Sequence, residues 1–535
     1  MSFVLVLLAT VTLSAQTVDV PPATPAAKLV RSLVDGGSSD LRNVYAPAGY
    51  SLVWTRLGRP TAQAQAVIAQ LETASVKGLD ATDYTGGQWA TRIANLRGDA
   101  ALARFDVDLT SAALQYASDL RLGRVNPREV SFDFDLGAKR LYAPVLIQQL
   151  TTSNDPATVL ASLEPKHEDY RRLIAALAAY RRIEAASADQ APLPVVAKLK
   201  VGQTYEALPA MAALLRRLGD LDANAVVTGT TYEGAIVDAV KHFQSRHGLD
   251  ADGVIGKTTF AQLNVPVSTR VQQLQLAIER WRWIPESEAS SIIVNIPEFT
   301  LRARDSQNGE ELTMRVVVGK AAGHQTPVFD GDIKHVVFRP YWSVPPSIQR
   351  GEIAPKLERD GGYLARNNYE LVDDSGRSLG SSVDADTARR VRNGSVSVRQ
   401  KPGTSNALGL VKFLFPNDNN VYLHSTPSQS LFARSRRDFS HGCIRVEDPV
   451  TLAEWTLRGQ DEWSKKKIQA AIDGKKDDLY VKIQRPVNVT IMYATASATA
   501  NGEVHFFQDI YGHDTQLAKV LEPEQKGAAV LVAAK

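Results

Sequence analysis

One thiol is the centre of the chemistry that this sequence could perform. Cys443 is the single cysteine of 535 residues and lies in the segment Ser440-His441-Gly442-Cys443-Ile444-Arg445. A free thiol has a pKa of about 8.5, so it is mostly protonated at neutral pH and needs a base or positive surroundings to act as a nucleophile. Gly442 would let a substrate approach the backbone closely, and the amides of Gly442 and Cys443 are candidate donors to an oxyanion.

The surroundings of the thiol favour a reactive role. Asp448-Pro449 has the form of a helix N-cap followed by proline at the first helical position, which predicts a helix start. The positive end of that helix and Arg445 would both favour the thiolate. A free cysteine is commonly a buried small hydrophobe, but such a residue normally lies in an apolar run and not between Gly442 and Ile444. We therefore predict that Cys443 is a nucleophile.

Two histidines are candidates for the base. His424 ends the predicted strand that runs through 420–423, and His441 lies two residues before the thiol. Positions i and i+2 of a tight turn seldom allow a linear S–H···N contact, whereas a strand end can meet the thiol across a sheet. We predict His424 as the base, with Ser425 or its carbonyl fixing the imidazole tautomer. Cys443, His424 and His441 are also zinc-ligand types, but a fourth ligand is not evident, so we predict no metal and no cofactor.

Composition places these residues in a multidomain protein. The chain is 44% hydrophobic and 22% charged, as globular proteins are, and its length predicts three or four domains. The net charge of +3 comes with no basic stripe, which argues against a nucleic-acid partner. The nearest basic cluster is Arg434-Ser435-Arg436-Arg437, a composition usual in solvated loops.

The first residues predict export. The apolar run Phe3–Leu13 has the length of a signal-peptide core and is followed by Ser14 and Ala15, although no lysine or arginine precedes it. It is shorter than the roughly 20 residues that a spanning helix needs. We expect a signal peptide over 1–15 and no membrane span after its cleavage.

Hydrophobic periodicity divides the rest of the chain into helical and strand-rich parts. Apolar residues recur at helical spacing from about Ala62 to Tyr180. A compact unit follows over 208–265, in which Thr230 and Glu233 have the form of a capping box. A further helix is predicted over 271–283.

After Pro285 the period becomes strand-like. Strands over 292–296 and 312–318 flank Asn308-Gly309, and Asn501-Gly502 separates 487–494 from 504–507, so two hairpins are predicted. The polar stretch over 351–403 is too long for an ordinary loop and predicts an inserted lid or subdomain.

These residues resemble a known enzyme family. His424 with Ser440-His441-Gly442-Cys443-Ile444-Arg445 resembles the signature of the L,D-transpeptidase catalytic domain. Its other motifs are similar to Gly319-Lys320 with Gln325-Thr326-Pro327-Val328-Phe329, and to Arg339-Pro340-Tyr341-Trp342-Ser343-Val344-Pro345. The unit over 208–265, with Asp252-Gly253-Val254-Ile255-Gly256, resembles a three-helix peptidoglycan-binding domain, and the helical region resembles the scaffold domain of large periplasmic members.

The resemblance implies a fold and a domain order. The expected class is multidomain α+β, with a helical scaffold domain, a small three-helix peptidoglycan-binding domain and a mainly-β catalytic domain with an inserted lid. The expected ranges are a signal peptide over 1–15, the scaffold domain over 28–200, the binding domain over 205–266, a linker helix over 267–286, the catalytic domain over 287–485 with a lid at about 351–403, and a C-terminal β extension over 486–535.

The resemblance also implies an activity. Cys443 would attack a tetrapeptide stem at the L-centre of its diamino acid, release D-Ala, and pass the acyl group to an amine on a neighbouring stem, forming a 3→3 crosslink. His424 would be the base and the carbonyl of Ser425 would orient it, although many members carry glycine there. The implied catalytic residues are Cys443, His424, Ser425, His441 and Gly442. The implied substrate-binding residues are Arg445, Tyr341, Trp342, Thr326 and Ser440.

Two alternatives stay open at this stage. An L,D-carboxypeptidase would use water in place of the acceptor amine, and a non-catalytic wall-binding scaffold would use only the binding unit. The expected partners are peptidoglycan stem peptides and glycan, and carbapenem-type inhibitors; other cell-wall enzymes are candidates. The cluster Arg434–Arg437 would either attract stem carboxylates or form a solvated loop. The expected location is the periplasm, in association with the cell wall.

Overall fold

The computed structural model describes residues 19–187, 191–286, 290–305, 309 and 311–522. The chain forms two compact units, the first from residues up to 125 with 136–166, and the second from 126–135 with 167–520; the last residues from Leu521 are grouped with the first unit. The predicted signal segment over 1–15 and Asn308 of the first predicted hairpin lie outside the described residues. Among the described residues no helix has the length and apolar character needed to span a membrane.

The first unit is helical, as the periodicity predicts. Its helices are α1 (Pro25–Val34), α2 (Ser39–Tyr45), α3 (Ala62–Glu72), α4 (Trp89–Ala94), α5 (Gly98–Leu122), α6 (Ala143–Thr152) and α7 (Pro156–Ala161), with a small hairpin of β1 (Thr55–Arg56) and β2 (Arg59–Pro60). The side chains of Thr24, Ser38 and Thr61 each accept a hydrogen bond from a first-turn amide and so define where α1, α2 and α3 begin. The long helix α5 supplies residues to both cores of this unit.

A buried carboxylate lies within α5. Asp106 accepts hydrogen bonds from the amides of Val53 (3.0 Å) and Trp54 (2.9 Å) and from the hydroxyl of Tyr45 (2.8 Å). Burial raises the pKa of Asp106 to about 6, while these three donors act to lower it. The carboxylate thus ties α5 to the loop that precedes β1 and to α2.

The second unit begins with helices that surround the predicted binding domain. These are α8 (Glu168–Ala185), α9 (Leu208–Leu218), α10 (Ala235–Arg246), α11 (Lys257–Leu263) and α12 (Val267–Trp283). Helix α12 confirms the helix predicted over 271–283. The predicted capping box is wrong, because α10 begins after Gly234, at φ +70°, with no side-chain cap. One core joins α9, α10 and α11 through buried side chains that include Leu215, Val240 and Phe260.

The strand-rich part is a ten-stranded sheet among the described residues. Its strands are β3 (Phe132–Asp133), β4 (Ser291–Asn295), β5 (Thr300–Arg304), β6 (Glu311–Gly319), β7 (Val328–Phe338), β12 (Val411–Leu414), β13 (Leu423–His424), β14 (Asp438–Ser440), β15 (Ile444–Val446) and β16 (Leu479–Met492). The order is β12-β13-β15-β6-β5-β4-β16-β7-β3, β14 pairs with β6, and β12 also pairs with β7, so the sheet closes on itself. Buried valines and isoleucines of β4, β6, β7 and β16 fill it.

Both predicted hairpins require a correction to their first strand. Antiparallel β5 precedes the turn that contains Gly309, and β6 follows it, so the strand over 292–296 lies one position further back. The turn at Asn501-Gly502 joins β17 (Ala496–Ala498) to β18 (Val504–Phe506), whereas 487–494 belongs mostly to the long strand β16. The turn signals were correct, and the strands that the pattern missed, β5 and β17, are only five and three residues long.

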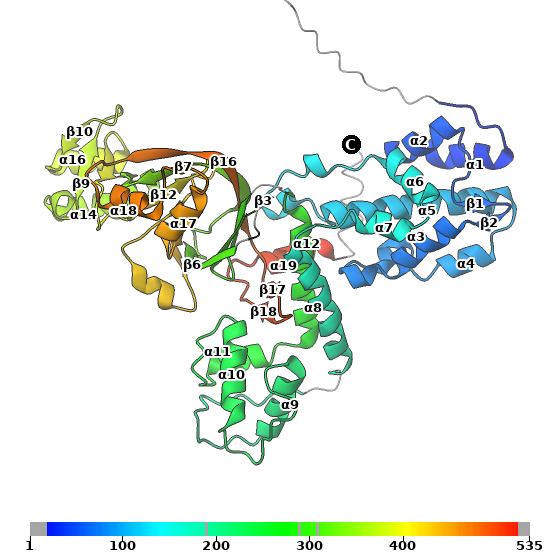
Figure 1. Cartoon of the computed structure of the whole chain (residues 1–535), viewed down its shortest axis with the longest axis horizontal. Helices are drawn as coiled ribbons and strands as arrows, with labels where there is room; N and C mark the ends of the chain where they lie inside the picture. Colours follow the sequence, from blue (N-terminus) through cyan, green and yellow to red (C-terminus); the bar gives the residue numbers. More distant parts are fainter. Residues whose placement is uncertain (1–18, 188–190, 287–289, 306–308, 310, 523–535) are drawn as a thin grey trace, which may run out of the picture. The chain divides into compact units, whose positions relative to one another are not determined.

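The predicted insertion is a folded subdomain. It contains β8 (Trp342–Ser343), α13 (Pro346–Ile348), the π-helical turn η6 (Gln349–Ile353), α14 (Ala354–Leu357), α15 (Tyr363–Arg366), β9 (Tyr369–Val372), β10 (Ser378–Gly380), α16 (Ala385–Asn393) and β11 (Ser397–Gln400). The strand order is β10-β9-β11-β8, and the core is its own, with Leu364, Val391 and Val398 buried. Figure 1 shows β9, β10, α14 and α16 gathered at one end of the ten-stranded sheet. We call Trp342–Gln400 the lid subdomain.

Three helices complete the second unit. Helix α17 (Pro449–Thr456) begins where Asp448-Pro449 predicts, and Asp448 Oδ1 accepts the amide of Thr451 at 3.0 Å. Helices α18 (Lys465–Asp473) and α19 (His513–Leu521) follow. Arg280 of α12 forms a buried ion pair with Asp514 of α19, which fixes these two helices to each other.

Candidate active site

The thiol lies at the junction of two strands. β14 runs parallel to β6 and ends at Ser440, and β15 begins at Ile444, so Cys443 is the last residue of the connecting turn. Ser440 Oγ accepts the amide of Gly442 at 3.1 Å and donates to the carbonyl of Cys443 at 2.6 Å. Gly442 has φ +117°, a conformation that favours glycine. The turn is therefore held by Ser440 and permitted by Gly442.

A second brace comes from the segment after β6. Thr326 Oγ1 donates to the carbonyl of Gly442 at 2.8 Å and accepts the amide of Gly319 at 2.8 Å. The hydroxyl of Tyr511 donates to the carbonyl of Gly319 at 2.5 Å and accepts the amide of Thr326 at 3.2 Å. Thr326 is only 1% exposed and Ser440 only 2%. Both residues are buried and hold the thiol turn in place, and their contact with substrate stays a prediction.

Strand register brings His424 to the thiol turn. β13 and β15 run parallel, with Leu423 opposite Ile444 and His424 opposite Arg445. The amide of Ile444, directly after Cys443, donates to the carbonyl of Tyr422 at 3.1 Å. The end of β13, which carries the imidazole, thus lies beside β15, the strand that follows the thiol turn.

The tautomer of His424 is fixed by its neighbour. Nδ1 lies 2.6 Å from the carbonyl oxygen of Ser425, so Nδ1 carries the proton and Nε2 the lone pair. Burial, with Arg445 as the second cause, lowers the pKa of His424 to about 3, although the Ser425 carbonyl acts to raise it. The imidazole is neutral at physiological pH.

Ser425 is anchored by its hydroxyl as well as by its backbone. Its Oγ accepts the amide of Leu410 at 2.6 Å and donates to the carbonyl of Leu408 at 3.1 Å. A side chain at Gly409 would collide with this hydroxyl. The serine therefore fits because position 409 is glycine, and the carbonyl that orients His424 is held from both sides.

The thiol is half-buried and protonated at rest. Its Sγ lies 3.7 Å from the carbonyl of Asn420. Burial raises the pKa of Cys443, whereas Tyr422, Lys412 and Arg445 act to lower it. The resting thiol therefore needs a base, as the sequence predicts, because the loss of solvent has a larger effect on its pKa than the positive groups around it.

Two neighbours of the thiol were missed in the sequence. Lys412 is the register partner of His424 on β12, and its Nζ lies 3.9 Å from the ring centroid of Tyr422. Burial lowers the pKa of Lys412, while Cys443 acts to raise it. Tyr422 precedes His424 by two residues and so shares its face of the strand, which is the one signal that could have identified it. The β12–β13 register that brings in Lys412 has no local signal.

The remaining predicted residues lie around the lid. His441 Nε2 is 2.7 Å from Glu352 Oε1 of η6, so the thiol turn contacts the lid subdomain directly. The guanidinium carbon of Arg399 lies 4.1 Å from the ring centroid of Tyr341. The ring centroids of Trp342 and Tyr369, in the lid core, are 6.3 Å apart. Because the Gly442 amide is taken by Ser440, the Cys443 amide is the one candidate oxyanion donor of the predicted pair.

The candidate zinc site is not supported by any cluster. Among the described residues, no group of three or more histidine, cysteine, aspartate or glutamate side chains could hold a metal ion. His441 is directed to Glu352, and Nδ1 of His424 to a carbonyl.

Three stretches of the chain match known families. Residues 289–470 match the family model of the L,D-transpeptidase catalytic domain, residues 205–263 that of the "Putative peptidoglycan binding domain", and residues 39–177 that of the scaffold domain. A curated protein of Haemophilus influenzae named "Putative L,D-transpeptidase" is 32% identical over 253 residues, which is 47% of this chain and 50% of that protein. The chain spans about half the length of this curated relative.

Two solved structures are also similar. An L,D-transpeptidase from Stackebrandtia nassauensis is 14% identical, covering 56% of this chain and 97% of that chain with a TM-score of 0.21. An L,D-transpeptidase in complex with imipenem is 17% identical, covering 38% of this chain and 59% of that chain with a TM-score of 0.18. The family matches confirm the resemblance found in the sequence: this chain is similar to an L,D-transpeptidase that carries a scaffold domain and a peptidoglycan-binding domain.

Proposed function

We propose that this protein is a peptidoglycan L,D-transpeptidase that forms 3→3 crosslinks through a thioester on Cys443. The single observation that supports this most strongly is the parallel β13–β15 register, which brings a neutral, tautomer-fixed His424 beside the turn that carries the thiol. The match of residues 289–470 to the catalytic domain supports the same reaction class.

The reaction starts from a neutral thiol and a neutral imidazole. His424 Nε2 takes the thiol proton as the sulfur attacks the carbonyl carbon at the L-centre of the donor stem. The carbonyl oxygen becomes an oxyanion, for which the Cys443 amide is the available donor. The C–N bond to D-Ala then breaks, and the imidazolium returns its proton to the leaving amine. An acceptor amine next attacks the thioester, His424 takes its proton, and the protonated thiol is released.

The neutral resting pair has a consequence for selectivity. A thiolate that exists before substrate binds would react with oxidants, whereas a thiol of raised pKa reacts only when a substrate completes the proton transfer. Arg445 and Lys412 reduce the cost of the negative sulfur that forms at that moment. The lid subdomain would keep water from the thioester, because Glu352 contacts His441 of the thiol turn.

The proposed place of action is the periplasm, at the cell wall, after export by the segment over 1–15. The partners are stem peptides and glycan strands. The match to a peptidoglycan-binding domain supports this location. The L,D-carboxypeptidase remains the second candidate, because water and an amine would use the same acyl-enzyme.

Carbapenem labelling tests the proposed nucleophile. We expect wild type to gain the mass of one acyl group, measured on the intact protein, and Cys443→Ala to gain none. Thr451→Ala, at the start of α17 and beyond the thiol turn, is a control for general effects and should label at the wild-type rate. Absence of the adduct on wild type would refute the proposal.

Product analysis separates the two enzymatic candidates. Incubation with tetrapeptide muropeptides should give crosslinked dimers, detected by chromatography and mass spectrometry. Tripeptide products alone would favour the carboxypeptidase, and no turnover together with sacculus binding would favour the non-catalytic scaffold.

A further inference from the structure

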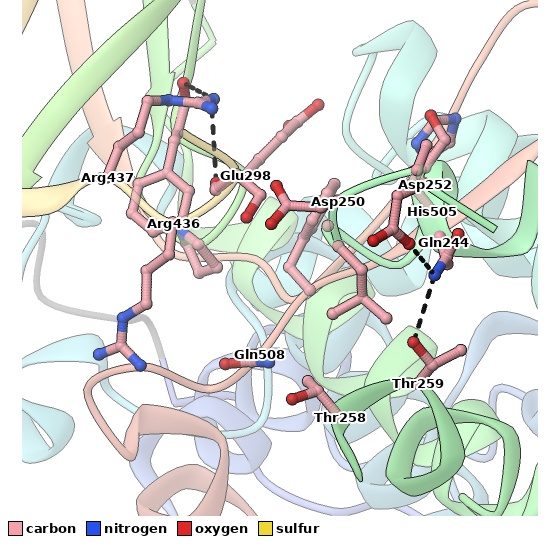
Figure 2. A pocket seen from close by; sticks show the side chains of 18 of the residues that line it. Gln244, Asp250, Asp252, Thr258, Thr259, Glu298, Arg436, Arg437, His505 and Gln508 are labelled. Atoms are coloured by element: carbon pink, nitrogen blue, oxygen red, sulfur yellow. Dashed lines mark hydrogen bonds between the residues drawn. The ribbon is translucent and has the colours of Figure 1, made fainter. Parts of the chain in front are cut away.

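The two arginines of the largest cavity of the second unit already have partners. This cavity of about 740 Å³, shown in Figure 2, has Arg436 and Arg437 in its lining. Arg437 donates to the carbonyls of Phe299 (3.1 Å) and Val316 (3.2 Å), and Arg436 donates to Asp438 at 2.7 and 2.9 Å. Arg437 is therefore part of the wall, and the alternative of a solvated loop is wrong for it. Neither arginine offers an unmatched charge that would select a ligand.

Two cations beside the thiol are arranged differently. Lys412 of β12 lies opposite His424 of β13, and His424 lies opposite Arg445 of β15. Side chains at directly opposite positions of neighbouring strands point to the same face of a sheet. The three side chains therefore form a row across three adjacent strands, with the imidazole in the middle and a cation on each side.

Neither of these cations has an anionic partner. Within the described part of the chain, the side chains of Lys412 and Arg445 form no ion pair and no hydrogen bond. The Nε atom of Arg445 is enclosed without an acceptor. Lys412 is only half-buried, so a ligand can reach its ammonium. Charged groups that lose solvent are normally paired in folded proteins, so the row lacks an anion.

The ammonium of Lys412 is directed toward the thiol. Its Nζ lies 3.9 Å from the ring centroid of Tyr422, directly before β13, and Tyr422 interacts with Cys443. The carboxylate that acts on Lys412 electrostatically is Asp478, directly before β16. β7 lies between β12 and β16, so the backbone of Asp478 is two strand spacings away, roughly 10 Å. Asp478 thus leaves the ammonium unpaired.

The resting thiol does not supply the missing negative charge either. Burial raises the pKa of Cys443, so the sulfur is neutral at rest. Burial lowers the pKa of Lys412 and that of Arg445, and Cys443 acts to raise both. A bound carboxylate would act on both cations in the same direction as an ionised sulfur. The row is electrostatically complete only when a ligand provides that charge.

The proposed substrate carries a carboxylate at the required place. The residue that leaves the tetrapeptide stem is D-Ala, and three bonds separate its carboxylate carbon from the carbonyl carbon that Cys443 attacks. Bond lengths limit the distance between these two carbons to about 4 Å. A cation beside the thiol therefore meets this carboxylate when the sulfur is in position to attack. A stem with one more residue would place an uncharged amide there.

We propose that Lys412 binds the terminal carboxylate of the donor stem and so makes the protein specific for stems that end one residue after the bond it cleaves. The inference rests on the proposed function for the identity of the substrate. The ammonium of Lys412 donates to the carboxylate, while Arg445, on the other side of His424, remains available to the negative charge that develops on the sulfur. When D-Ala leaves, it takes the carboxylate with it.

The binding of two matched peptides to Cys443→Ala tests the inference without turnover. One is the tetrapeptide with its free terminal carboxylate, the other is the same tetrapeptide as the terminal amide, and calorimetry measures both Kd values. We expect the acid to bind about tenfold more tightly than the amide, because the amide cannot form the charge-assisted hydrogen bond. Adding Lys412→Met should reduce this ratio to less than about twofold, whereas Lys412→Arg should retain most of it.

Lys334→Met is the matched control. Lys334 lies on β7, is exposed, and pairs with Asp332 at 3.3 Å, so its loss should leave the ratio of the two Kd values unchanged. The ratio also separates ligand binding from a structural role. If Lys412 only supported the ring of Tyr422, its loss would weaken the binding of acid and amide alike.

Three outcomes would overturn the inference. The first is equal binding of acid and amide by Cys443→Ala. The second is a ratio that Lys412→Met leaves unchanged. The third is no binding of either peptide to Cys443→Ala.

Carbapenem labelling and product analysis decide the proposed function separately. If wild type takes no adduct and gives no product, the proposed function fails, and the ratio of the two Kd values still decides whether Lys412 binds a carboxylate. If wild type is active, the same peptides give a second measurement. The kcat/KM for release of the fourth residue should be about tenfold higher for the acid than for the amide in wild type, and less than about twofold higher in Lys412→Met. An equal preference in both proteins would refute the inference and leave the proposed function intact.

Discussion

Two buried titratable sites, one in each unit, differ in how completely their polar atoms are satisfied. Asp106 accepts two backbone amides and a tyrosine hydroxyl, all supplied by fixed parts of the helical unit. His424 has one nitrogen held by a carbonyl, and the thiol beside it has a long contact to the carbonyl of Asn420 and interacts with Tyr422. Burial shifts the pKa at both sites, raising that of Asp106 to about 6 and lowering that of His424 to about 3.

The difference shows what distinguishes a structural from a reactive buried group. A carboxylate with all its partners in place stabilises the fold and has no capacity left for a substrate. An imidazole with a fixed Nδ1–H and a lone pair on Nε2 can still accept a proton at Nε2. The pKa shift alone would have marked both sites, so the hydrogen-bond inventory is the better guide.

The largest effect that sharpens this comparison is expected from His424→Gln. Without a base the neutral thiol keeps its proton, so carbapenem acylation should slow roughly a thousandfold. Stopped-flow absorbance of the carbapenem measures the rate. Ser425→Ala is the matched control, because it retains the carbonyl that orients the ring and should lose much less. Equal loss in both variants would mean that fold damage, and not proton transfer, is being measured.

The sequence predicted the reactive site where its signals are local. The thiol turn, the helix start at Asp448 and His424 as a strand-end histidine all follow from neighbours in the chain. Lys412 could not be predicted in the same way, because its place beside the thiol depends on the β12–β13 register. The register between strands depends on the whole closed sheet, so no single residue indicates it.

Burial was the other property that residue types did not reveal. Thr326 and Ser440 belong to motifs of the family and were expected at the substrate, yet their hydroxyls bond the thiol turn from inside. A hydroxyl serves equally well as a substrate donor or as a brace, so the sequence cannot distinguish the two roles. The further rise in the pKa of Cys443 on burial could not be predicted for the same reason, since desolvation is a property of the packed structure.

A second, smaller effect should come from Asp106→Ala. Removing the acceptor leaves the buried amides of Val53 and Trp54 without their partner and takes one of the partners of the Tyr45 hydroxyl, which should lower the free energy of unfolding by about 3 kcal/mol. Asp108→Ala, on the same helix, removes partly exposed ion pairs with Arg92 and Arg104 and should cost less than about 1 kcal/mol. Denaturant unfolding measures both.

The acylation rate tells whether the two sites are independent in function. Carbapenem acylation of Asp106→Ala should match wild type at temperatures where the protein is folded, because Asp106 has no part in the reaction. A slower rate at full folding would contradict the assignment of Asp106 as purely structural.

The smallest effect is a pair of opposite pH dependences. His424 has a folded pKa of about 3 against about 6.5 unfolded, so its contribution to stability is present above pH 6.5 and is lost as the pH falls toward 3. Asp106 has a folded pKa of about 6 against about 3.9 unfolded, so its contribution is present below pH 3.9 and is lost as the pH rises through 6. Between pH 4 and 6 each group changes the free energy of unfolding by about 1.4 kcal/mol per pH unit, and the two changes have opposite sign.

Hydrogen exchange at pH 4.5, 5.0, 5.5 and 6.0 would measure both slopes, using peptides from α5 for the helical unit and from β13 for the catalytic unit. Other carboxylates also titrate in this range, so each slope is taken as the difference between wild type and the variant that cannot titrate. The difference between wild type and His424→Gln should favour wild type more as the pH rises, because only wild type gains from keeping a neutral imidazole. The difference between wild type and Asp106→Asn should favour wild type more as the pH falls. Slopes of the same sign would show that burial does not act on the two groups in the opposite directions that their charges require.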